Sequence, residues 1–450
     1  MIKTSAIFLF LNYCLGKKVD MSMVVTNLDW RQLYTFASRQ ALLGFCFDGI
    51  ERLTKEFSEE LKQNPMGRDL LMTWMGAAQQ IRRQNMNVNA VASKLYSMLR
   101  KDGLRCCILK GQGNALMYPN VYSRNPGDID VWVNASRSQI TEYAKKHFEI
   151  GDDIRYHHIE TSMDGVPVEL HFFPCTMNNP LYHARLQKWF KRNADLQCSN
   201  VVSLPDGIGE IAIPTTAFNV IYQLTHLYHH FFDEGIGMRQ IIDYFLVVND
   251  FSKNVFLDND FSNPSVSLSK GSSTSHPSPL SSEERDETAL RCSEPLRYKD
   301  GGASKPSPNC AGWDRLSIGG DNSTGSTTAV TSSASTVLDV VQRELKHLGL
   351  WQFAGAVMYV LHEALGLPEE KMIAPMDEKR GKLLLAEILN GGNFGKHFTK
   401  YGHFTQQGMA KKYFLKIWRN MHFVRYYPAE ALCEPIFRTW HFFWRMKNKK

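Results

Sequence analysis

Residues 127–133 read GDIDVWV, and this stretch decides the fold and the chemistry that the sequence predicts. Polar and apolar residues alternate along it, which predicts a β-strand over 128–133. Side chains two positions apart on a strand share one face, so Asp128 and Asp130 project together, about 7 Å apart. Two carboxylates at that spacing can bind a pair of divalent ions about 3.5–4 Å apart, the arrangement used for in-line phosphoryl displacement. Oxygen ligands favour Mg²⁺, so we expect two magnesium ions here.

A third carboxylate follows in residues 168–172, which read VELHF. On a strand, Glu169 and His171 share one face while the apolar residues between them face the core. If this strand lies beside the strand of Asp128 and Asp130, Glu169 reaches the same point and becomes the third metal ligand. As a general base, Glu169 could also take the proton of an attacking hydroxyl group. His171 either contributes to substrate binding or forms a hydrogen bond at the surface of the sheet.

Candidate phosphate-binding residues lie upstream of these strands. Residues 108–113 read ILKGQG, a strand that runs into a helix through glycines. Such a turn lets backbone N–H groups at the start of a helix approach phosphate closely. Gly111 would form this turn, Lys110 would add a point charge, and Arg124 could bind phosphate with its planar guanidinium. Lys110 and Arg124 fit equally well as surface residues in salt bridges.

The hydrophobic pattern around these residues predicts one small core over 102–178, with the element order β-α-β-α-β-β. Asp164-Gly165, between the last two strands, is typical of a hairpin turn. The expected fold class is therefore α+β, a small mixed-sheet core flanked by N-terminal helices and a C-terminal helical domain. The predicted strands are 104–109, 128–133, 154–162 and 166–173, and the predicted helices are 111–118 and 136–147.

Helical periodicity flanks this core on both sides. We expect N-terminal helices over 25–101 and a helical domain over 179–251 that resumes over 337–450. Residues 252–336 are rich in Ser, Thr, Pro and Gly and carry few apolar residues in register, which predicts a disordered insertion. Residues 1–24 contain a short apolar stretch without a cleavage site, so they are predicted to be disordered or to precede the true start.

Composition excludes several classes of protein. The 450 residues are 43% apolar and 22% charged, which is typical of a globular chain with a large core and excludes global disorder. No apolar run is long enough to predict a membrane-spanning helix. The nine cysteines are scattered without a CxxC pair, which favours reduced thiols in a cytoplasmic protein. The net charge of +7 is concentrated in residues 396–450, which hold twelve Lys or Arg and two Glu.

These motifs resemble the polymerase-beta-type nucleotidyltransferase superfamily. More narrowly, Leu-Lys-Gly at 109–111, Gly-Asp-Ile-Asp at 127–130 and Glu-Leu-His at 169–171 are similar to an uncharacterised bacterial nucleotidyltransferase family, over roughly residues 30–250. The resemblance implies transfer of a nucleotidyl group from a nucleoside triphosphate (NTP) to a hydroxyl acceptor. It also implies that the three carboxylates bind the two metal ions. The acceptor stays open, because superfamily members act on small molecules, proteins or nucleic acids.

Several residues outside these motifs have both a functional and a structural interpretation. His226, His229 and His230 lie on one side of a predicted helix, where they either face the site or pack against neighbouring helices. Arg239 and Asp243 are spaced for an intrahelical ion pair or for a nucleotide contact. The glycine-rich residues 391–395 are most simply a helix C-cap and turn, with a phosphate loop as the weaker alternative. His157 and His158 are interpreted as ordinary strand residues.

The basic tail supports an alternative function. Residues 396–450 interleave aromatic residues with Lys and Arg. The structural interpretation is a set of amphipathic helices packed on the helical domain, and the functional one is a surface for single-stranded nucleic acid or for a membrane. The alternative to the enzyme is therefore a catalytically weak, nucleotidyltransferase-like binding protein. A toxin or immunity component acting on tRNA or protein is a third hypothesis.

Overall fold

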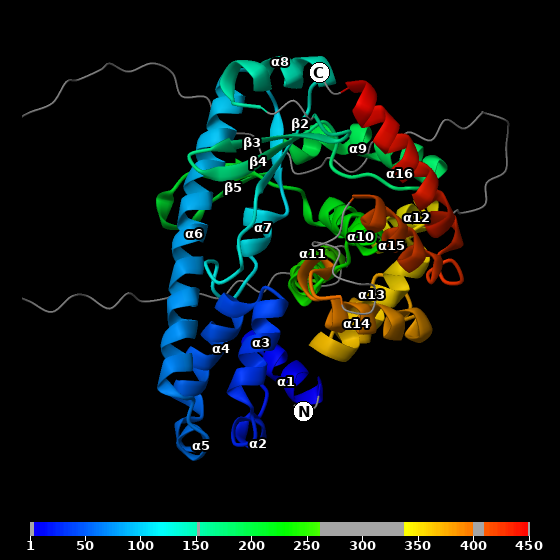
Figure 1. The fold of residues 1–450 in the computed structure, drawn as a ribbon. Helices are drawn as coiled ribbons and strands as arrows, with labels where there is room; N and C mark the ends of the chain where they lie inside the picture. The colour runs from blue at the N-terminus through cyan, green and yellow to red at the C-terminus, as the bar shows by residue number, and fades with distance from the viewer. Residues whose placement is uncertain (1–3, 151–153, 262–336, 399–408, 449–450) are drawn as a thin grey trace, which may run out of the picture. The chain divides into compact units, whose positions relative to one another are not determined.

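The computed structural model describes residues 4–150, 154–261, 337–398 and 409–448. These residues form an α+β fold in which a small mixed sheet lies between N-terminal helices and a C-terminal helical region (Figure 1). The predicted fold class is therefore confirmed. Most of the predicted disordered insertion over 252–336 lies outside the described residues.

The sheet has four strands in the order β1-β2-β4-β3. β2 pairs antiparallel with β1 and parallel with β4, and β3 pairs antiparallel with β4. Each strand corresponds to one of the four predicted segments, and two helices connect them as the sequence predicts. The strands are β1 (Cys106–Leu109), β2 (Ile129–Val133), β3 (His158–Met163) and β4 (Val166–His171), and the connecting helices are α7 (Gly111–Ala115) and α8 (Arg137–His147).

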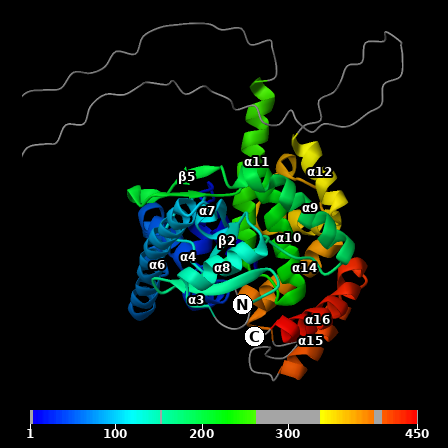
Figure 2. The ribbon, with the colours of Figure 1, turned by 90° about the horizontal axis from the view of Figure 1, so that it is seen from above.

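Helices before and after the sheet make up most of the described chain (Figure 2). The N-terminal helices are α1 (Thr4–Cys14), α2 (Ser22–Val25), α3 (Trp30–Arg39), α4 (Leu43–Glu56), α5 (Ser58–Gln63) and α6 (Arg68–Lys101). The later helices are α9 (Pro180–Gln197), α10 (Thr216–Asp233), α11 (Met238–Phe261), α12 (Val337–His347), α13 (Trp351–Leu365), α14 (Glu378–Gly391), α15 (Met409–Met421) and α16 (Pro428–Asn448). The described residues also contain three short 3₁₀ turns, η1 (Pro205–Gly207), η2 (Glu369–Lys371) and η3 (Asn393–Gly395).

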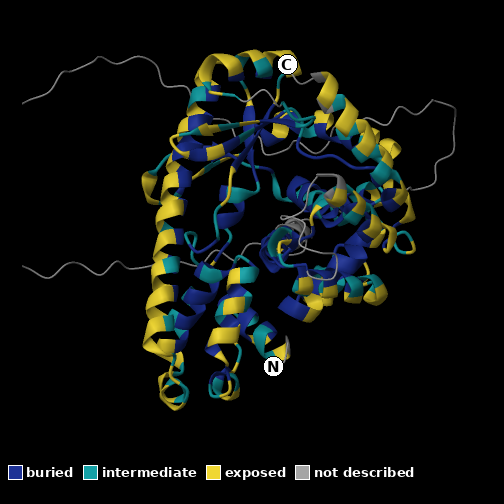
Figure 3. Ribbon diagram, viewed as in Figure 1, coloured by how far each residue is buried: buried dark blue, intermediate teal, exposed yellow. Residues whose placement is uncertain are grey.

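The sheet is buried on both faces, which explains its apolar strands. On one face, Val131 of β2 packs in a core shared with Leu95 of α6 and with α8. On the other face, the Trp132 ring stacks 6.0 Å from the Phe218 ring of α10. These four residues are all buried, and Figure 3 shows buried positions running along the strands of the sheet. Because side chains alternate along a strand, Asp130 lies on the Trp132 face, toward α10.

Helix α1 differs from the prediction that residues 1–24 are disordered or precede the start. Phe10, Leu11 and Tyr13 are fully buried, and α1 contacts α4 and α13. The Arg52 guanidinium of α4 lies 4.1 Å from the Tyr13 ring centroid. The apolar stretch of residues 6–15 is thus part of the hydrophobic core.

Two further elements differ from the sequence analysis. β5 (Val201–Ser203) and β6 (Glu210–Ala212) form a separate antiparallel hairpin that was not predicted. Strands of three residues show too little alternation to be recognised. Helix α11 also continues to Phe261, beyond the predicted end of the helical segment at residue 251.

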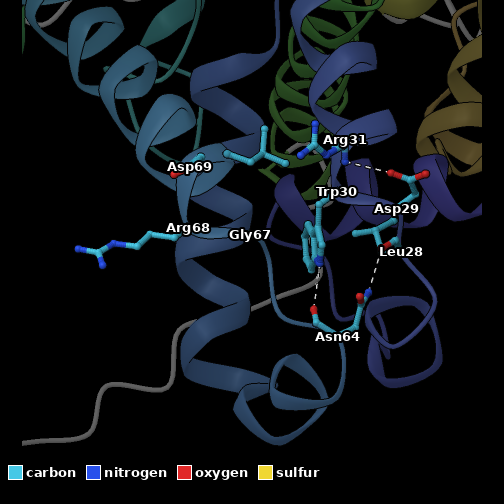
Figure 4. Close-up of a pocket in the computed structure, with 9 residues that line it drawn as sticks. Leu28, Asp29, Trp30, Arg31, Asn64, Gly67, Arg68 and Asp69 are labelled. Atoms are coloured by element: carbon cyan, nitrogen blue, oxygen red, sulfur yellow. Dashed lines mark hydrogen bonds between the residues drawn. The ribbon is translucent and has the colours of Figure 1, made fainter.

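The N-terminus of α3 is fixed by side-chain hydrogen bonds beside a surface pocket (Figure 4). Asp29 caps α3, because its Oδ1 accepts hydrogen bonds from the backbone N–H groups of Arg31 and Gln32, both at 3.0 Å. The indole N–H of Trp30 donates to the Asn64 carbonyl oxygen at 2.9 Å, and Asn64 Nδ2 donates to the Leu28 carbonyl oxygen at 2.8 Å. These hydrogen bonds join α3 to the turn before α6, and none of the residues that line this pocket belongs to the sheet.

The contact between α1 and α4 depends on Gly49. A Cβ atom at Gly49 would lie 2.3 Å from Cys14 Sγ and 3.2 Å from the Phe10 ring, so a side chain there would push α1 away from the core. We expect Gly49→Ala to lower the free energy of unfolding by about 1–3 kcal/mol. Gly76→Ala on the exposed face of α6 meets no atom within 4 Å and should raise it by about 0.5–1 kcal/mol. Urea unfolding checks both, and equal effects of the two variants would contradict the packing of α1.

The attachment of α16 depends on Glu430, which is buried and accepts hydrogen bonds from the backbone N–H groups of Asn178 and Asn179. Burial raises the pKa of Glu430 to about 7, whereas an unfolded Glu titrates near 4.3. The folded protein therefore holds this proton more tightly, and stability is lost as the pH rises between these two values. We expect wild type to lose roughly 3 kcal/mol relative to Glu430→Gln across that interval. Urea unfolding at about pH 5 and about pH 8 measures this difference, and parallel pH profiles would refute it.

Candidate active site

The predicted carboxylates lie at one cavity of about 600 Å³. Asp128, Asp130 and Glu169 line it from the sheet, and residues of α10, α11 and η3 line it from the helical region. Asp130 and Glu169 are directly paired residues on the parallel strands β2 and β4. The structure therefore places Asp130 and Glu169 side by side, as the sequence analysis expected if the two strands were neighbours, and Asp128 lines the same cavity. Their catalytic and metal-binding roles stay predictions.

Positive groups lie against two of the carboxylates. Lys110 Nζ is 3.0 Å from Asp130 Oδ2, and His171 Nε2 is 2.9 Å from Asp130 Oδ1 and 3.1 Å from Glu169 Oε2. Burial alone would raise the pKa of Asp130, but Lys110 and His171 hold it below its ordinary value. Burial would lower the pKa of His171, but its hydrogen bonds to the two carboxylates raise it to about 9. His171 is therefore protonated at neutral pH and shares its charge between Asp130 and Glu169.

Asp128 has a different environment from its two neighbours. It lies just before β2, at an exposed position on the cavity rim. The negative charge of Asp130 raises the pKa of Asp128 to about 6. The carboxylates thus repel one another even with Lys110 and His171 beside them. A group of carboxylates with unrelieved repulsion is an electrostatic environment that attracts cations.

The turn at Lys110 and Gly111 lies next to these carboxylates. Lys110 has φ +51°, in the region that favours glycine, and such a conformation costs on the order of 1–3 kcal/mol. A Cβ atom at Gly111 would lie 3.9 Å from the Asp128 carbonyl oxygen, so this turn and the start of β2 are neighbours. Helix α7 after the turn has only five residues, which makes its N-terminus a weak phosphate site. Phosphate binding by Lys110 and Gly111 stays a prediction.

Arg124 lines the cavity, but its guanidinium forms an ion pair with Asp243. Its Nε and Nη2 atoms lie 2.9 and 2.8 Å from the two carboxylate oxygens of Asp243, and the Tyr118 hydroxyl donates to Asp243 Oδ1 at 2.7 Å. Burial would lower the pKa of Arg124, but Asp243 raises it. Asp243 therefore pairs with Arg124, from another part of the chain, rather than with Arg239 on its own helix. The predicted phosphate contact of Arg124 would have to compete with this ion pair.

The three histidines of α10 line the cavity. His226 Nε2 lies 2.8 Å from Lys110 Nζ and 3.0 Å from His230 Nε2, and His229 Nδ1 lies 3.2 Å from Thr176 Oγ1. Burial lowers the pKa of each of them, to about 3 for His230, so all three are neutral at neutral pH. His226 thus accepts a hydrogen bond from Lys110 and orients it. Of the two interpretations of these histidines, the structure supports the one in which they face the site.

His158 is a site residue that the sequence analysis missed. It pairs with His171 across β3 and β4, and its Nδ1 lies 3.0 Å from Glu169 Oε2. Burial lowers the pKa of His158 to about 4, so the ring is neutral, and its Nδ1 approaches Glu169 without forming a hydrogen bond. Its position opposite His171 in the predicted hairpin was the signal that could have identified it.

The residues of the site fit a divalent cation. Carboxylate oxygens of Asp130 and Glu169 lie within 4.8 Å of each other, and Asp128 lines the same cavity. His171 is protonated and therefore serves as a hydrogen-bond donor to these oxygens, not as a metal ligand. The raised pKa of Asp128 shows an excess of negative charge that a cation would relieve. Carboxylate oxygens predominate, and these are the ligands that hard cations prefer.

The C-terminal tail uses several of its cations inside the protein. Lys416 and Arg438 each lie 2.8 Å from the Asp233 carboxylate of α10. Exposed apolar side chains on α16 include Ile436, which is 70% exposed, and Phe443, which is 61% exposed. Across the described ranges, no helix is both long and apolar enough to cross a lipid bilayer. Binding of nucleic acid or a membrane by this tail stays a prediction.

Comparison with known proteins agrees with the geometry of the site. Among solved structures, an antigenic nucleotidyltransferase-like protein from Paracoccidioides brasiliensis is similar, with 16% identity, a TM-score of 0.24, and coverage of 36% of this chain and 75% of that chain. That score is too low for the likeness to support an argument about fold or function. No curated protein matches the sequence. The sequence model of a family described as an uncharacterised nucleotidyltransferase matches residues 26–261, which is more than half of the chain, and the protein therefore belongs to this nucleotidyltransferase family.

Proposed function

We propose that the protein transfers a nucleoside monophosphate from an NTP to a hydroxyl acceptor. The observation that carries this proposal is the pairing of Asp130 with Glu169 on adjacent parallel strands, at a cavity that Asp128 also lines. Membership of the nucleotidyltransferase family supports an NTP as the donor. The acceptor is a small molecule, a protein or an RNA, and we propose a cytoplasmic location.

Asp128, Asp130 and Glu169 would hold the metal, which we propose to be two Mg²⁺ ions. When bound, Mg²⁺ supplies Lewis-acid stabilisation of the charge on the phosphates and the attacking oxygen. The protein keeps the necessary carboxylates ionised, because Lys110 and His171 hold the pKa of Asp130 low and the His171 hydrogen bond counters the effect of burial on Glu169. Asp128 is the exception, with its pKa raised to about 6 by Asp130.

The chemical step that we propose is an in-line displacement at the α-phosphorus. A bond forms between the acceptor oxygen and the α-phosphorus, and the bond from that phosphorus to the bridging oxygen of the β-phosphate breaks. Pyrophosphate leaves with the electron pair, and Glu169 takes the proton of the acceptor hydroxyl as general base. The positive charges of Lys110 and His171 lie within 3.1 Å of the carboxylates, where they can counter the negative charge that develops on the phosphates.

Loss of the central carboxylate should abolish this activity. Asp130→Asn removes one negative charge from the proposed metal ligands. Loss of a residue that only hydrogen-bonds a metal ligand already lowers metal affinity or activity about 10–100-fold, so we expect loss of a ligand to lower transfer by more than about 100-fold. Each α-³²P-labelled NTP, added with Mg²⁺ to purified protein and a cell extract, reveals the donor and the labelled acceptor.

Asp164→Asn is the matched control for this variant. Asp164 lies at the exposed tip of the β3–β4 hairpin with φ +49°, a conformation that Asn tolerates, and it pairs with exposed Lys94. The same change of charge there should leave transfer unchanged. Equal activity of the Asp130 and Asp164 variants, or wild-type protein that binds no NTP in the presence of Mg²⁺, would refute the proposal.

The second candidate function rests on the exposed apolar side chains of α15 and α16. Phe414 on α15 is 67% exposed, and Ile436 and Phe443 on α16 are 70% and 61% exposed. A binding protein that uses this face and the tail cations for single-stranded nucleic acid should lose affinity steeply as salt rises. We expect Phe414→Ala with Phe443→Ala, both at exposed positions, to weaken such binding and Asp130→Asn to leave it intact. Fluorescence anisotropy with labelled oligonucleotides at increasing salt tests this, and affinity that does not vary with salt would exclude it.

A further inference from the structure

One wall of the active-site cavity carries polar atoms without hydrogen-bond partners. Among the described residues, buried atoms of this kind include Arg239 Nε, Gln240 Nε2, Asn125 Oδ1, Asn393 Oδ1 and His230 Nδ1. All five residues line the cavity, together with Phe394. We call these six residues the Phe394 wall. Arg239 is 9% exposed and Gln240 is 7% exposed, so solvent reaches little of either side chain.

Three segments of the chain form this wall, and two of them, around Gly237 and Asn393, pack backbone to backbone. A Cβ atom at Gly237 would lie 2.7 Å from Asn393 Cα. The turn before α11 can therefore approach the η3 turn this closely only because residue 237 has no side chain. Gly237 also donates its backbone N–H to Gln240 Oε1 at 2.9 Å. Phe394 has φ +53°, a strained conformation that turns its ring toward Arg239 at 5.7 Å and His230 at 5.2 Å.

Buried polar atoms without partners cost about 1–3 kcal/mol each, and natural proteins keep few of them. Five of them at one cavity indicate a ligand that supplies their partners. A phosphate group accepts hydrogen bonds but donates few, whereas this wall offers both donors and acceptors through its three amide side chains. An aromatic ring beside mixed hydrogen-bonding groups is the chemistry that recognises the edge and face of a nucleobase.

The position of the wall relative to the carboxylates fits a nucleotide. Asn125 precedes Asp128 by three residues, and the Arg239 guanidinium donates to the Asn125 carbonyl oxygen at 3.2 Å. Asp128 lies near enough to influence the pKa of Arg239, although burial is the main cause that lowers it. A nucleotide whose phosphates lie at Asp128 and Asp130 can therefore place its base against the Phe394 wall.

We propose that the Phe394 wall is the nucleobase-binding subsite and that it makes the enzyme select one NTP over the others. This inference rests on the proposed function, because it assumes that phosphates bind at the carboxylates. Gln240 is the key specificity-determining residue, since its Oε1 already accepts a hydrogen bond from Gly237 and only its Nε2 remains to contact the base.

The test is the affinity of the full-length protein for ATP, GTP, CTP and UTP with Mg²⁺, measured by calorimetry beside inorganic tripolyphosphate. We expect wild type to bind one NTP at least about tenfold more tightly than the others. Gln240→Glu keeps the acceptor for Gly237 and replaces the free donor with an acceptor, so it should erase or change this preference without weakening tripolyphosphate. Phe394→Leu should weaken all four NTPs while tripolyphosphate is unaffected. Gln79→Glu on the exposed face of α6 is the control for the change of charge and should leave the four affinities unchanged.

The outcomes separate this inference from the function on which it rests. Wild-type protein that binds neither NTPs nor tripolyphosphate would overturn both. Equal affinity for the four NTPs, NTPs that bind no better than tripolyphosphate, or a Gln240→Glu variant with the wild-type preference would each overturn the base subsite and leave the proposed transfer reaction in place. Retained tripolyphosphate affinity also shows that a variant is folded.

Discussion

The arrangement of this molecule depends on the parallel pairing of β2 with β4. That pairing sets Asp130 beside Glu169 on one face of the sheet, where two buried carboxylates would repel each other strongly. Lys110 and His171 make the arrangement stable, because each places a positive charge within about 3 Å of an acidic oxygen. The sheet therefore carries a compact group of two carboxylates and two positively charged side chains, and all four residues line the cavity.

Neutral histidines complete this electrostatic arrangement. His226 and His230 lie one helical turn apart on α10 and are kept uncharged by burial, with the charge of Lys110 acting in the same direction. A neutral His226 can accept the hydrogen bond from Lys110, whereas a protonated ring would repel it. The helical region thus supports the sheet by orienting one cation without adding another positive charge next to it. His171, which touches both acids, is the one histidine of the described sheet whose pKa is raised.

The sequence predicted what local patterns encode. Alternation in GDIDVWV and VELHF located both strands, and the Asp164-Gly165 turn located the hairpin that carries Glu169. Contacts between distant segments could not be predicted in this way. The Arg124–Asp243 ion pair joins residues 119 positions apart, so the short spacing of Arg239 and Asp243 gave the wrong partner. Phe394 belongs to a glycine-rich turn that the sequence analysis interpreted as a helix end, with a phosphate loop as the weaker alternative, and its contacts with Arg239 and His230 join segments far apart in the sequence.

Residues beyond the family match contribute both to the Phe394 wall and to the packing around α10, which bears on where this protein can be divided. The family match ends at residue 261, but Phe231 of α10 packs against Phe353 of α13 and Phe423, with ring centroids 5.8 and 4.6 Å apart. A fragment that stopped at the family boundary would keep every carboxylate and still expose the interior surface of α10. The residues that match the family and the residues that close the hydrophobic core are therefore different lengths of chain, and the matched residues alone would leave that core incomplete.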